Sequence, residues 1–236
     1  MKTLGVIGGL GPMASAYFLQ LLTQMSDAQT DQEHMEVLLY SRPSIPDRTK
    51  YILGESEDNP VPDMVQTGKK LKEMGADILA VPCITAHHFH KELEDGIGLP
   101  IINAVEETAA CLEEKKVTRT GILATDGTIR SGLFQNILKQ HDICSILPEE
   151  ENQKKVMEII FGQIKAGKSV DMECFRKVSE DLTKQGAQVV LLACTELSLI
   201  KRDYGLPSGY LDVMEVLARK AVQSCNRVRK EYRWLV

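Results

Sequence analysis

The sequence predicts an α/β fold of two pseudo-symmetric α/β domains with largely parallel sheets and a site in the cleft between them. Three observations support this prediction. Short β-rich runs alternate with amphipathic segments, the first half of the chain is repeated in the second, and each half carries a cysteine at the equivalent place. Strands that alternate with helices form parallel sheets covered on both faces, and such sheets bind ligands at the carboxyl ends of their strands.

The predicted strands and helices alternate along the chain. Strands are expected at the runs richest in β-branched and aliphatic residues, namely Thr3–Ile7, Glu36–Tyr40, Asp77–Pro82, Ile101–Ile102, Thr120–Ala124, Ile143–Leu147 and Gln188–Ala193. Helices are expected where apolar residues recur at helical spacing, namely Pro12–Met25, Pro62–Met74, Ile129–Gln140, Gln153–Ala166 and Met172–Gln185.

The internal repeat divides the chain into two halves. The stretch "LGVIGGLGPMASAYFLQLL" aligns with "TGILATDGTIRSGLFQNIL", and "GADILAVPCIT" aligns with "GAQVVLLACTE", which places Cys83 on Cys194. The tripeptide "GLP" also recurs, each time before a short strand and a helix. We therefore predict an N-terminal domain over residues 1–115, a C-terminal domain over 116–208 and a closing helical segment over 209–236.

Composition and charge exclude several classes of protein. Hydrophobic residues make up 43% of the chain and charged residues 26%, which is typical of a globular protein. The formal net charge of −5 does not favour a nucleic-acid partner, and we interpret the basic stretch "RVRKEYR" as a solvated helix face. No apolar run is long enough to cross a membrane, and the opening "MKTLGVIGG" is typical of a strand rather than a signal peptide. We expect a cytoplasmic protein with no membrane contact whose six scattered cysteines are thiols.

The first turn, "GLGPMA", matches a dinucleotide-binding pattern through Gly9, Gly11 and Ala14. No acidic residue follows at the place where a ribose would need one, and the repeated copy "ATDGTIR" loses the pattern. The sequence therefore favours a turn in which backbone amides at a helix N-terminus approach a small anion such as a carboxylate. We also expect Met13, which follows this turn, to contact the substrate.

Taken alone, the stretch "AVPCITAHHFH" allows three interpretations, and the second cysteine adds a fourth. A metal site would need more ligands, and the sequence offers no second cluster, so we predict no metal. A buried structural cysteine with surface histidines leaves the repeated cysteine unexplained, and so does a Cys–His nucleophile pair, because "LLACTELSLI" contains no histidine. Two thiols on opposite walls of a cleft suit racemisation, in which one thiolate removes a proton and one thiol supplies another from the opposite face. The helix expected after each cysteine would favour its thiolate.

These motifs make the chain resemble the aspartate/glutamate racemase family, and most of all its aspartate racemase branch. The resemblance spans nearly the full length and is carried by "GVIGGLGPMAS", "SIPDRT", "PCITAH", "LATDGT", "ILPEEENQ" and "ACTEL". It implies a cofactor-independent amino-acid racemase that acts on aspartate or a related amino acid. It also implies a homodimer and a C-terminal helix, expected over Leu211–Arg229, that packs on the first domain. Cys83 and Cys194 are then the acid/base thiols.

The resemblance also implies residues that bind the substrate. Arg48 would clamp a carboxylate bidentately, although an arginine in a proline-rich loop can be an ordinary surface residue. Lys165 would be a second cationic contact, or a lysine favoured by the end of its helix, and Thr85 would belong to a carboxylate-binding element. Glu196 would orient a substrate ammonium group or stabilise the first turn of a helix.

Position 84 departs from the family pattern. The family usually has asparagine after the first cysteine, whereas this chain has Ile84, whose side chain offers no hydrogen bond. Substrate binding at this position therefore rests on the backbone amide, which favours a less polar substrate or a broader substrate range. Two alternatives stay open: a related isomerase or decarboxylase, of the hydantoin racemase or maleate isomerase type, and a small-carboxylate-binding protein that has lost catalysis.

Overall fold

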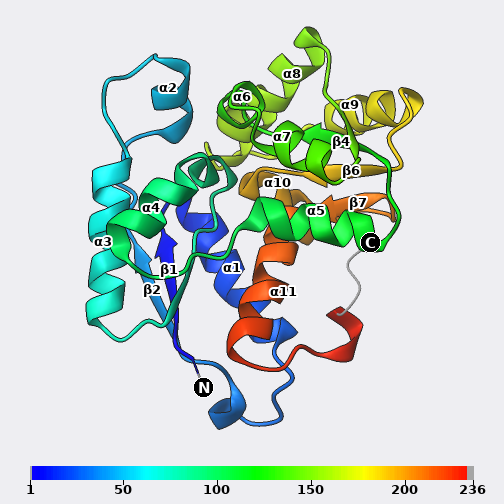
Figure 1. The fold of residues 1–236 in the computed structure, drawn as a ribbon. Helices are drawn as coiled ribbons and strands as arrows, with labels where there is room; N and C mark the ends of the chain where they lie inside the picture. Colours follow the sequence, from blue (N-terminus) through cyan, green and yellow to red (C-terminus); the bar gives the residue numbers. More distant parts are fainter. Residues whose placement is uncertain (1, 233–236) are drawn as a thin grey trace.

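The computed structural model describes residues 2–232, which form two α/β lobes (Figure 1). The first lobe contains a parallel sheet of β1 (Leu4–Gly8), β2 (Val37–Ser41) and β3 (Ile78–Ala80) in the order β2-β1-β3. The second contains β4 (Arg119–Leu123), β5 (Cys144–Ile146), β6 (Val189–Leu192) and β7 (Tyr210–Asp212) in the order β5-β4-β6-β7, again parallel. The predicted fold class is confirmed.

The two sheets share one topology. In each, the first strand of the lobe lies between the next two, so that β1 corresponds to β4. In the first lobe an isolated parallel bridge joins Leu79 to Ile101. It corresponds to the pairing of Val190 with Tyr210 between β6 and β7 in the second lobe. The expected strand at Ile101–Ile102 is therefore reduced to a single bridge, but the repeat extends to this edge of the sheet.

The helices cover both sheets. They are α1 (Pro12–Met25), α2 (Arg48–Leu53), α3 (Val61–Glu73), α4 (His90–Ile97), α5 (Ala104–Glu114), α6 (Asp126–Arg130), α7 (Leu133–Gln140), α8 (Glu150–Met157), α9 (Met172–Lys184), α10 (Thr195–Tyr204) and α11 (Val213–Cys225). Short 3-10 helices span Asp31–Glu33, Ile84–Phe89 and Lys230–Tyr232, and a π-helix spans Glu158–Ile164. Among residues 2–232, no helix has the length and apolar character that a membrane span requires.

Three other expected elements are divided or end earlier than predicted. The helix expected over Ile129–Gln140 is divided into α6 and α7, because Gly132 adopts a left-handed conformation with φ of 68°. The strand expected over Asp77–Pro82 ends at Ala80, and Pro82 has no N–H to extend the ladder. The helix expected over Gln153–Ala166 is α8 followed by the π-helix, and π-helices often occur at functional sites.

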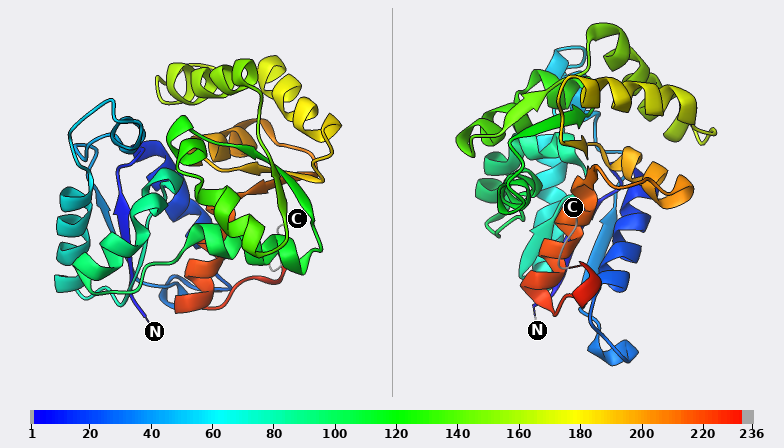
Figure 2. Two further views of the ribbon diagram at one scale, coloured as in Figure 1. Left: turned by 45° about the horizontal axis from the view of Figure 1, so that its top comes forward. Right: turned by 90° about the vertical axis from the view of Figure 1, so that its right-hand side faces the viewer.

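The last helix joins the two lobes. The expected helix over Leu211–Arg229 begins only at Val213, because the preceding residues form β7. Helix α11 packs against α1 and α5, and the views in Figure 2 place it between the lobes. The largest hydrophobic cluster contains Phe18 from α1, Phe134 from α7 and Leu217 from α11, so a continuous core links both halves.

Asp212 is a fully buried carboxyl group at the start of α11. Its Oδ1 accepts hydrogen bonds from the Ser198 hydroxyl at 2.6 Å and from the Met214 amide at 2.9 Å. Its Oδ2 has no hydrogen-bond partner among the described residues. Burial and then the charge of Glu215 raise the pKa of Asp212 from 3.8 to about 7. The folded protein therefore favours the protonated acid.

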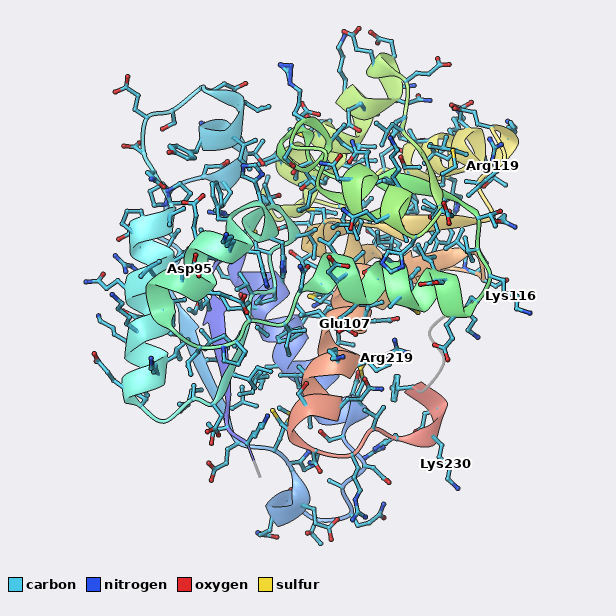
Figure 3. The ribbon with its side chains drawn as sticks, viewed as in Figure 1. Asp95, Glu107, Lys116, Arg119, Arg219 and Lys230 are labelled. Atoms are coloured by element: carbon cyan, nitrogen blue, oxygen red, sulfur yellow. The ribbon has the colours of Figure 1, made fainter. Side chains whose placement is uncertain are left out.

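This raised pKa predicts how stability depends on pH. The contribution of Asp212 to stability is complete below its unfolded pKa and is lost as the pH rises from about 4 to about 7. We expect Asp212→Asn to flatten the fall in the free energy of unfolding over this interval, measured by urea denaturation at several pH values. The control is Asp95→Asn on the outer surface of α4 (Figure 3), which should keep the wild-type profile. An unchanged slope in the Asp212 variant would contradict the assignment.

Candidate active site

The two cysteines of the repeat border one cavity between the lobes. Cys83 directly precedes the 3-10 helix Ile84–Phe89, and Cys194 directly precedes α10. Both follow the ends of equivalent strands, β3 and β6, and each is only 6% exposed. They line an inner cavity with about 10 Å³ of free space. The fold therefore brings the two thiols to the same small space.

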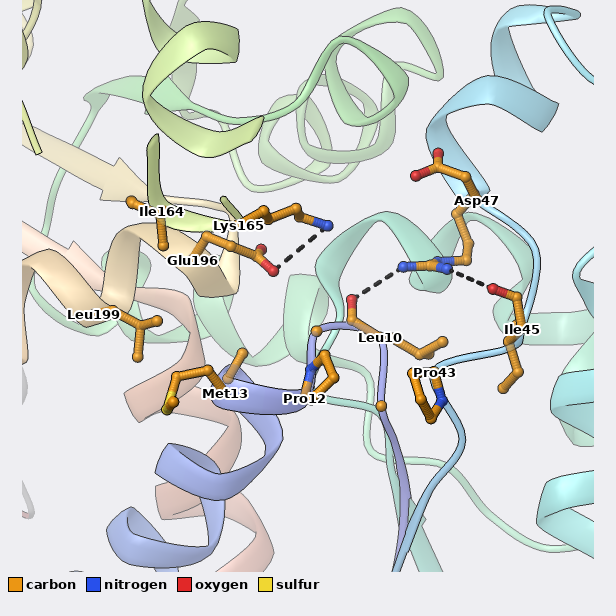
Figure 4. Close-up of a pocket in the computed structure, with 14 residues that line it drawn as sticks. Leu10, Pro12, Met13, Pro43, Ile45, Asp47, Ile164, Lys165, Glu196 and Leu199 are labelled. Carbon is orange, nitrogen blue, oxygen red and sulfur yellow. Dashed lines mark hydrogen bonds and ion pairs between the residues drawn. The ribbon is translucent and has the colours of Figure 1, made fainter. Parts of the chain in front are cut away.

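The inner cavity opens beside a larger outer pocket of about 410 Å³ (Figure 4). Of the residues predicted to bind substrate, five line the inner cavity: Arg48, Ile84, Thr85, Lys165 and Glu196. Met13 does not reach the inner cavity; it lies on the wall of the outer pocket and is 59% exposed. Leu10, Asp47, Arg48, Lys165 and Glu196 border both spaces.

Arg48 lies at the first position of α2, where it is 7% exposed. Its Nη1 donates to the carbonyls of Ile45 at 3.3 Å and Pro46 at 2.8 Å, and its Nη2 donates to the carbonyl of Leu10 at 3.0 Å (Figure 4). Burial lowers the pKa of Arg48, but a charged Cys83 and Asp47 outweigh this effect and raise that pKa above its ordinary value. Backbone carbonyls therefore hold the guanidinium in place. Because Arg48 is buried, it is not an ordinary surface arginine of a loop.

Glu196 connects the second cysteine to Lys165. The Cys194 thiol donates to Glu196 Oε2 at 3.0 Å, and Lys165 Nζ lies 3.5 Å from Glu196 Oε1. The ammonium of Lys165 also lies 4.8 Å from the centre of the Phe161 ring, within cation–π range. Burial and then the Glu196 carboxylate raise the pKa of Cys194 well above its ordinary value. Burial lowers the pKa of Lys165, but Glu196 and the thiolates raise it overall.

The glycine-rich turn approaches Glu196 from the other lobe. A Cβ atom at Gly11 would lie 2.5 Å from Glu196 Oε1, closer than a real Cβ contact allows. Gly11 is also the N-cap of α1, so the positive end of that helix faces the carboxylate. The sequence predicted that this turn would admit a small anion; in the structure the carboxylate beside it is the side chain of Glu196.

A cluster of three threonines joins the lobes beside the cysteines. The hydroxyl of Thr85 lies 3.0 Å from those of Thr125 and Thr128, which are 3.2 Å from each other. All three residues are buried, and Thr85 and Thr125 line the inner cavity. Sequence reasoning missed Thr125 and Thr128. The available signal was "TDGT", in which Thr125 caps α6 by accepting from the Thr128 amide.

The histidines after Cys83 have different surroundings. His87 is only 4% exposed and bonds through Nε2 to the Val81 carbonyl at 3.2 Å, so this histidine is part of the interior. Its burial lowers its pKa to about 4. His88 is exposed, and His90 is half-buried near Glu94. In the part of the chain that the structure describes, no group of three or more His, Cys, Asp or Glu residues could hold a metal ion.

Comparisons with known proteins agree with this architecture. Residues 7–221 match the model of the Asp/Glu/hydantoin racemase family. The structure resembles an aspartate racemase from Picrophilus torridus, with a TM-score of 0.84, 32% identity and coverage of 99% of this chain and 98% of that one. An aspartate racemase homologue from Pyrococcus horikoshii shares the fold, with a TM-score of 0.76, 21% identity and coverage of 95% and 99%.

A relative with a named activity also matches over nearly its whole length. The broad specificity amino-acid racemase RacX of Bacillus subtilis is 22% identical over 94% of this chain and 97% of its own. These findings confirm the predicted resemblance and identify the protein as an isomerase. The chain belongs to the Asp/Glu/hydantoin racemase family.

Proposed function

We propose that the protein racemises aspartate or a related free amino acid, without metal or organic cofactor, by proton transfer between Cys83 and Cys194. The observation that carries this proposal is the shared cavity, which both thiols border from equivalent strand ends of opposite lobes. A thiolate takes the Cα proton, and the electron pair of the broken C–H bond stays on the α-carbon, stabilised by the adjacent carboxyl group. The opposite thiol then gives its proton to the other face and becomes a thiolate.

The cavity offers groups that suit the polar part of an amino acid. The hydroxyls of Thr85 and Thr125 and the amide of Ile84 at the start of a 3-10 helix are suited to a carboxylate. Lys165 adds a positive charge, and Glu196 adds a negative one that suits the ammonium group. The inner space is too small for an amino acid as it stands, so we propose that the lobes separate slightly for the substrate to enter.

The relatives support two ranges of substrate. The P. torridus structure supports aspartate, whereas the B. subtilis relative supports a broader range. Ile84 is 2% exposed at the cavity wall and brings no polar side chain to it, which also favours a broader range. We further propose that the enzyme is cytoplasmic and acts as a homodimer. Light scattering would test the oligomeric state.

The test is a panel of single enantiomers incubated with fully reduced protein in D₂O. We expect aspartate or a related amino acid to be inverted and to gain deuterium at Cα. Chiral chromatography measures the inversion, and mass spectrometry measures the deuterium. If no amino acid in the panel shows either change, the proposal fails. The same samples distinguish a decarboxylase, because that enzyme changes the mass of the carbon skeleton. A binding protein would instead show no turnover and would raise its melting temperature when the ligand is added, which thermal denaturation measures.

A further inference from the structure

Strand β2 leaves one edge of the first sheet open. It is the outermost strand in the order β2-β1-β3, and its five residues exceed the three residues of each other edge strand, β3, β5 and β7. Proteins usually protect an edge with short strands, charges, proline or bulges. Val37–Ser41 carries no charge and no proline, and it pairs with β1 in unbroken register. All five residues are half-buried or exposed, whereas β1 is fully buried.

From this edge we infer that a second copy of the chain pairs with β2 in antiparallel fashion across a two-fold axis. The pairing joins the two three-stranded sheets of the copies into one continuous sheet. The inference rests on the homodimer proposed above and names the surface that forms it. A two-fold axis perpendicular to the sheet makes the two β2 strands antiparallel and keeps both α3 helices on the same side of the joined sheet.

The hydrogen-bonding groups of β2 alternate between β1 and the open edge. At the two ends of the strand, the Glu36 carbonyl accepts a hydrogen bond from β1 at 3.0 Å, and the Arg42 amide donates one to β1 at 3.1 Å. Successive residues of a strand direct their N–H and C=O groups to opposite sides. The even-numbered residues therefore face β1, and Val37, Leu39 and Ser41 direct their amides and carbonyls to the open edge.

These three outward residues are self-complementary about Leu39. With the axis at Leu39, this residue pairs with the partner's Leu39 and Val37 pairs with the partner's Ser41, and each pair exchanges two N–H···O bonds. An axis one residue further along would set Val37 against the partner's Pro43, which has no N–H. An axis one residue earlier would set Ser41 against the partner's Met35, which precedes the strand. The axis at Leu39 therefore satisfies the whole edge.

The side chains that this axis places opposite each other are also compatible. Glu36 faces the partner's Arg42, and Leu38 faces the partner's Tyr40, in pairs without backbone hydrogen bonds, where side chains approach most closely. Opposite charges and aromatic–aliphatic pairs across strands are stabilising. Glu36 is exposed, and Arg42 is held at this edge by an ion pair with Asp63 at 2.7 Å. The edge is therefore complementary to itself in charge as well as in hydrogen bonding.

A groove beside the strand adds contact surface. It has a volume of about 550 Å³ and is lined by β2 together with Lys70, Leu71 and Met74, from α3 and its C-terminal cap. Helix α3 lies beside β2 (Figure 1), and the Lys70 ammonium lies 5.5 Å from the centre of the Tyr40 ring. Met74 is 65% exposed. Methionine and tyrosine are enriched at protein interfaces, and the two α3 helices would flank the joined strands.

Hydrogen exchange of the wild-type protein, resolved for single amides, tests the surface directly. Light scattering first establishes the dimer. In that dimer the outward amides of Val37, Leu39 and Ser41 should exchange as slowly as the amides of Leu38 and Tyr40, which are bonded to β1. If the dimer forms through another surface, the three outward amides should exchange at least about tenfold faster than their two neighbours.

A charge at the axis tests the same surface in variants. Leu39→Lys and Leu39→Glu each place two like charges directly opposite each other, so each variant alone should have the mass of one chain by light scattering. An equal mixture of the two variants brings opposite charges together and should recover the mass of two chains. The matched control is Leu99→Lys, which changes another half-buried leucine, beside β3 at the opposite edge of the sheet, and should remain dimeric.

The outcomes separate the surface from the dimer itself. A monomeric wild-type protein would overturn the inference together with the proposed homodimer. A dimeric wild type whose Leu39 variants fold, by circular dichroism, and remain dimeric would overturn the surface alone. If a Leu39 variant does not fold, the wild-type exchange rates decide, and fast exchange at the outward amides overturns the inference. Neither experiment uses substrate, so both are independent of the enantiomer panel.

Discussion

Replacing Cys83 or Cys194 by alanine is expected to lower kcat for racemisation by about 10²–10⁴-fold, the usual contribution of a positioned acid or base. Each variant loses the group on one face of the substrate, so inversion requires proton transfer from water in its place. The two thiols lie in equivalent places, and we expect losses of similar size for both. The measurement is the initial rate of inversion by chiral chromatography, starting from each enantiomer in turn.

The variants should also separate exchange from inversion. With one cysteine left, a proton can leave and return only on that face, so one enantiomer should slowly gain deuterium at Cα without changing its configuration. Cys144→Ala is the control, because Cys144 is an exposed thiol on β5, away from the cavity, and should keep wild-type activity. Full racemase activity in either active-site variant would refute the two-cysteine mechanism.

Ile84→Asn is expected to lower the KM for the substrate by about 10- to 100-fold, corresponding to one added hydrogen bond to a charged group worth about 1.5–3 kcal/mol. The same change should destabilise the free protein by about 1–3 kcal/mol, because it places an amide in a site that is 2% exposed and belongs to the hydrophobic core. Substrate should restore part of this loss. The measurements are the KM and the free energy of unfolding with and without substrate.

Ile84→Leu is the matched control for this substitution. It keeps an apolar side chain of similar volume and should leave the KM close to the wild-type value, at a cost below about 1.5 kcal/mol in stability. If Ile84→Asn destabilises the protein but leaves the KM unchanged, the side chain at this position does not contribute to substrate binding. A broad substrate range of the enzyme could then not be attributed to Ile84.

Most of the fold could be predicted from the sequence because its two halves repeat. The alternation of strands and helices and the alignment of Cys83 with Cys194 are enough to place both sheets and the two equivalent strand ends. The prediction was least accurate where one residue interrupts an element. Gly132 divides α6 from α7, and the strand before Cys83 ends early near Pro82. The burial of His87 depends on the loop after β3 folding back onto the Val81 carbonyl, which no periodicity shows.

Most residues of the site could be predicted from the sequence, but the contacts among them could not. Cys83, Cys194 and Glu196 follow from the repeat and from their motifs. The hydrogen bonds of Arg48 to the Leu10 carbonyl and of Thr85 to Thr125 join residues about 40 positions apart, which only the packing of the loops determines. The close approach of Gly11 to Glu196 joins opposite lobes in the same way. These contacts decide the electrostatic surroundings of each sulfur.

The most direct test of the two-cysteine account is the position of the label early in the reaction. A single enantiomer of a substrate found in the panel is incubated with wild-type protein in D₂O and sampled at low conversion. Proton removal on one face and delivery on the other predict deuterium at Cα in the product enantiomer, while the recovered substrate keeps its protium. Equal labelling of substrate and product would contradict this account, because it would mean that a single base serves both faces.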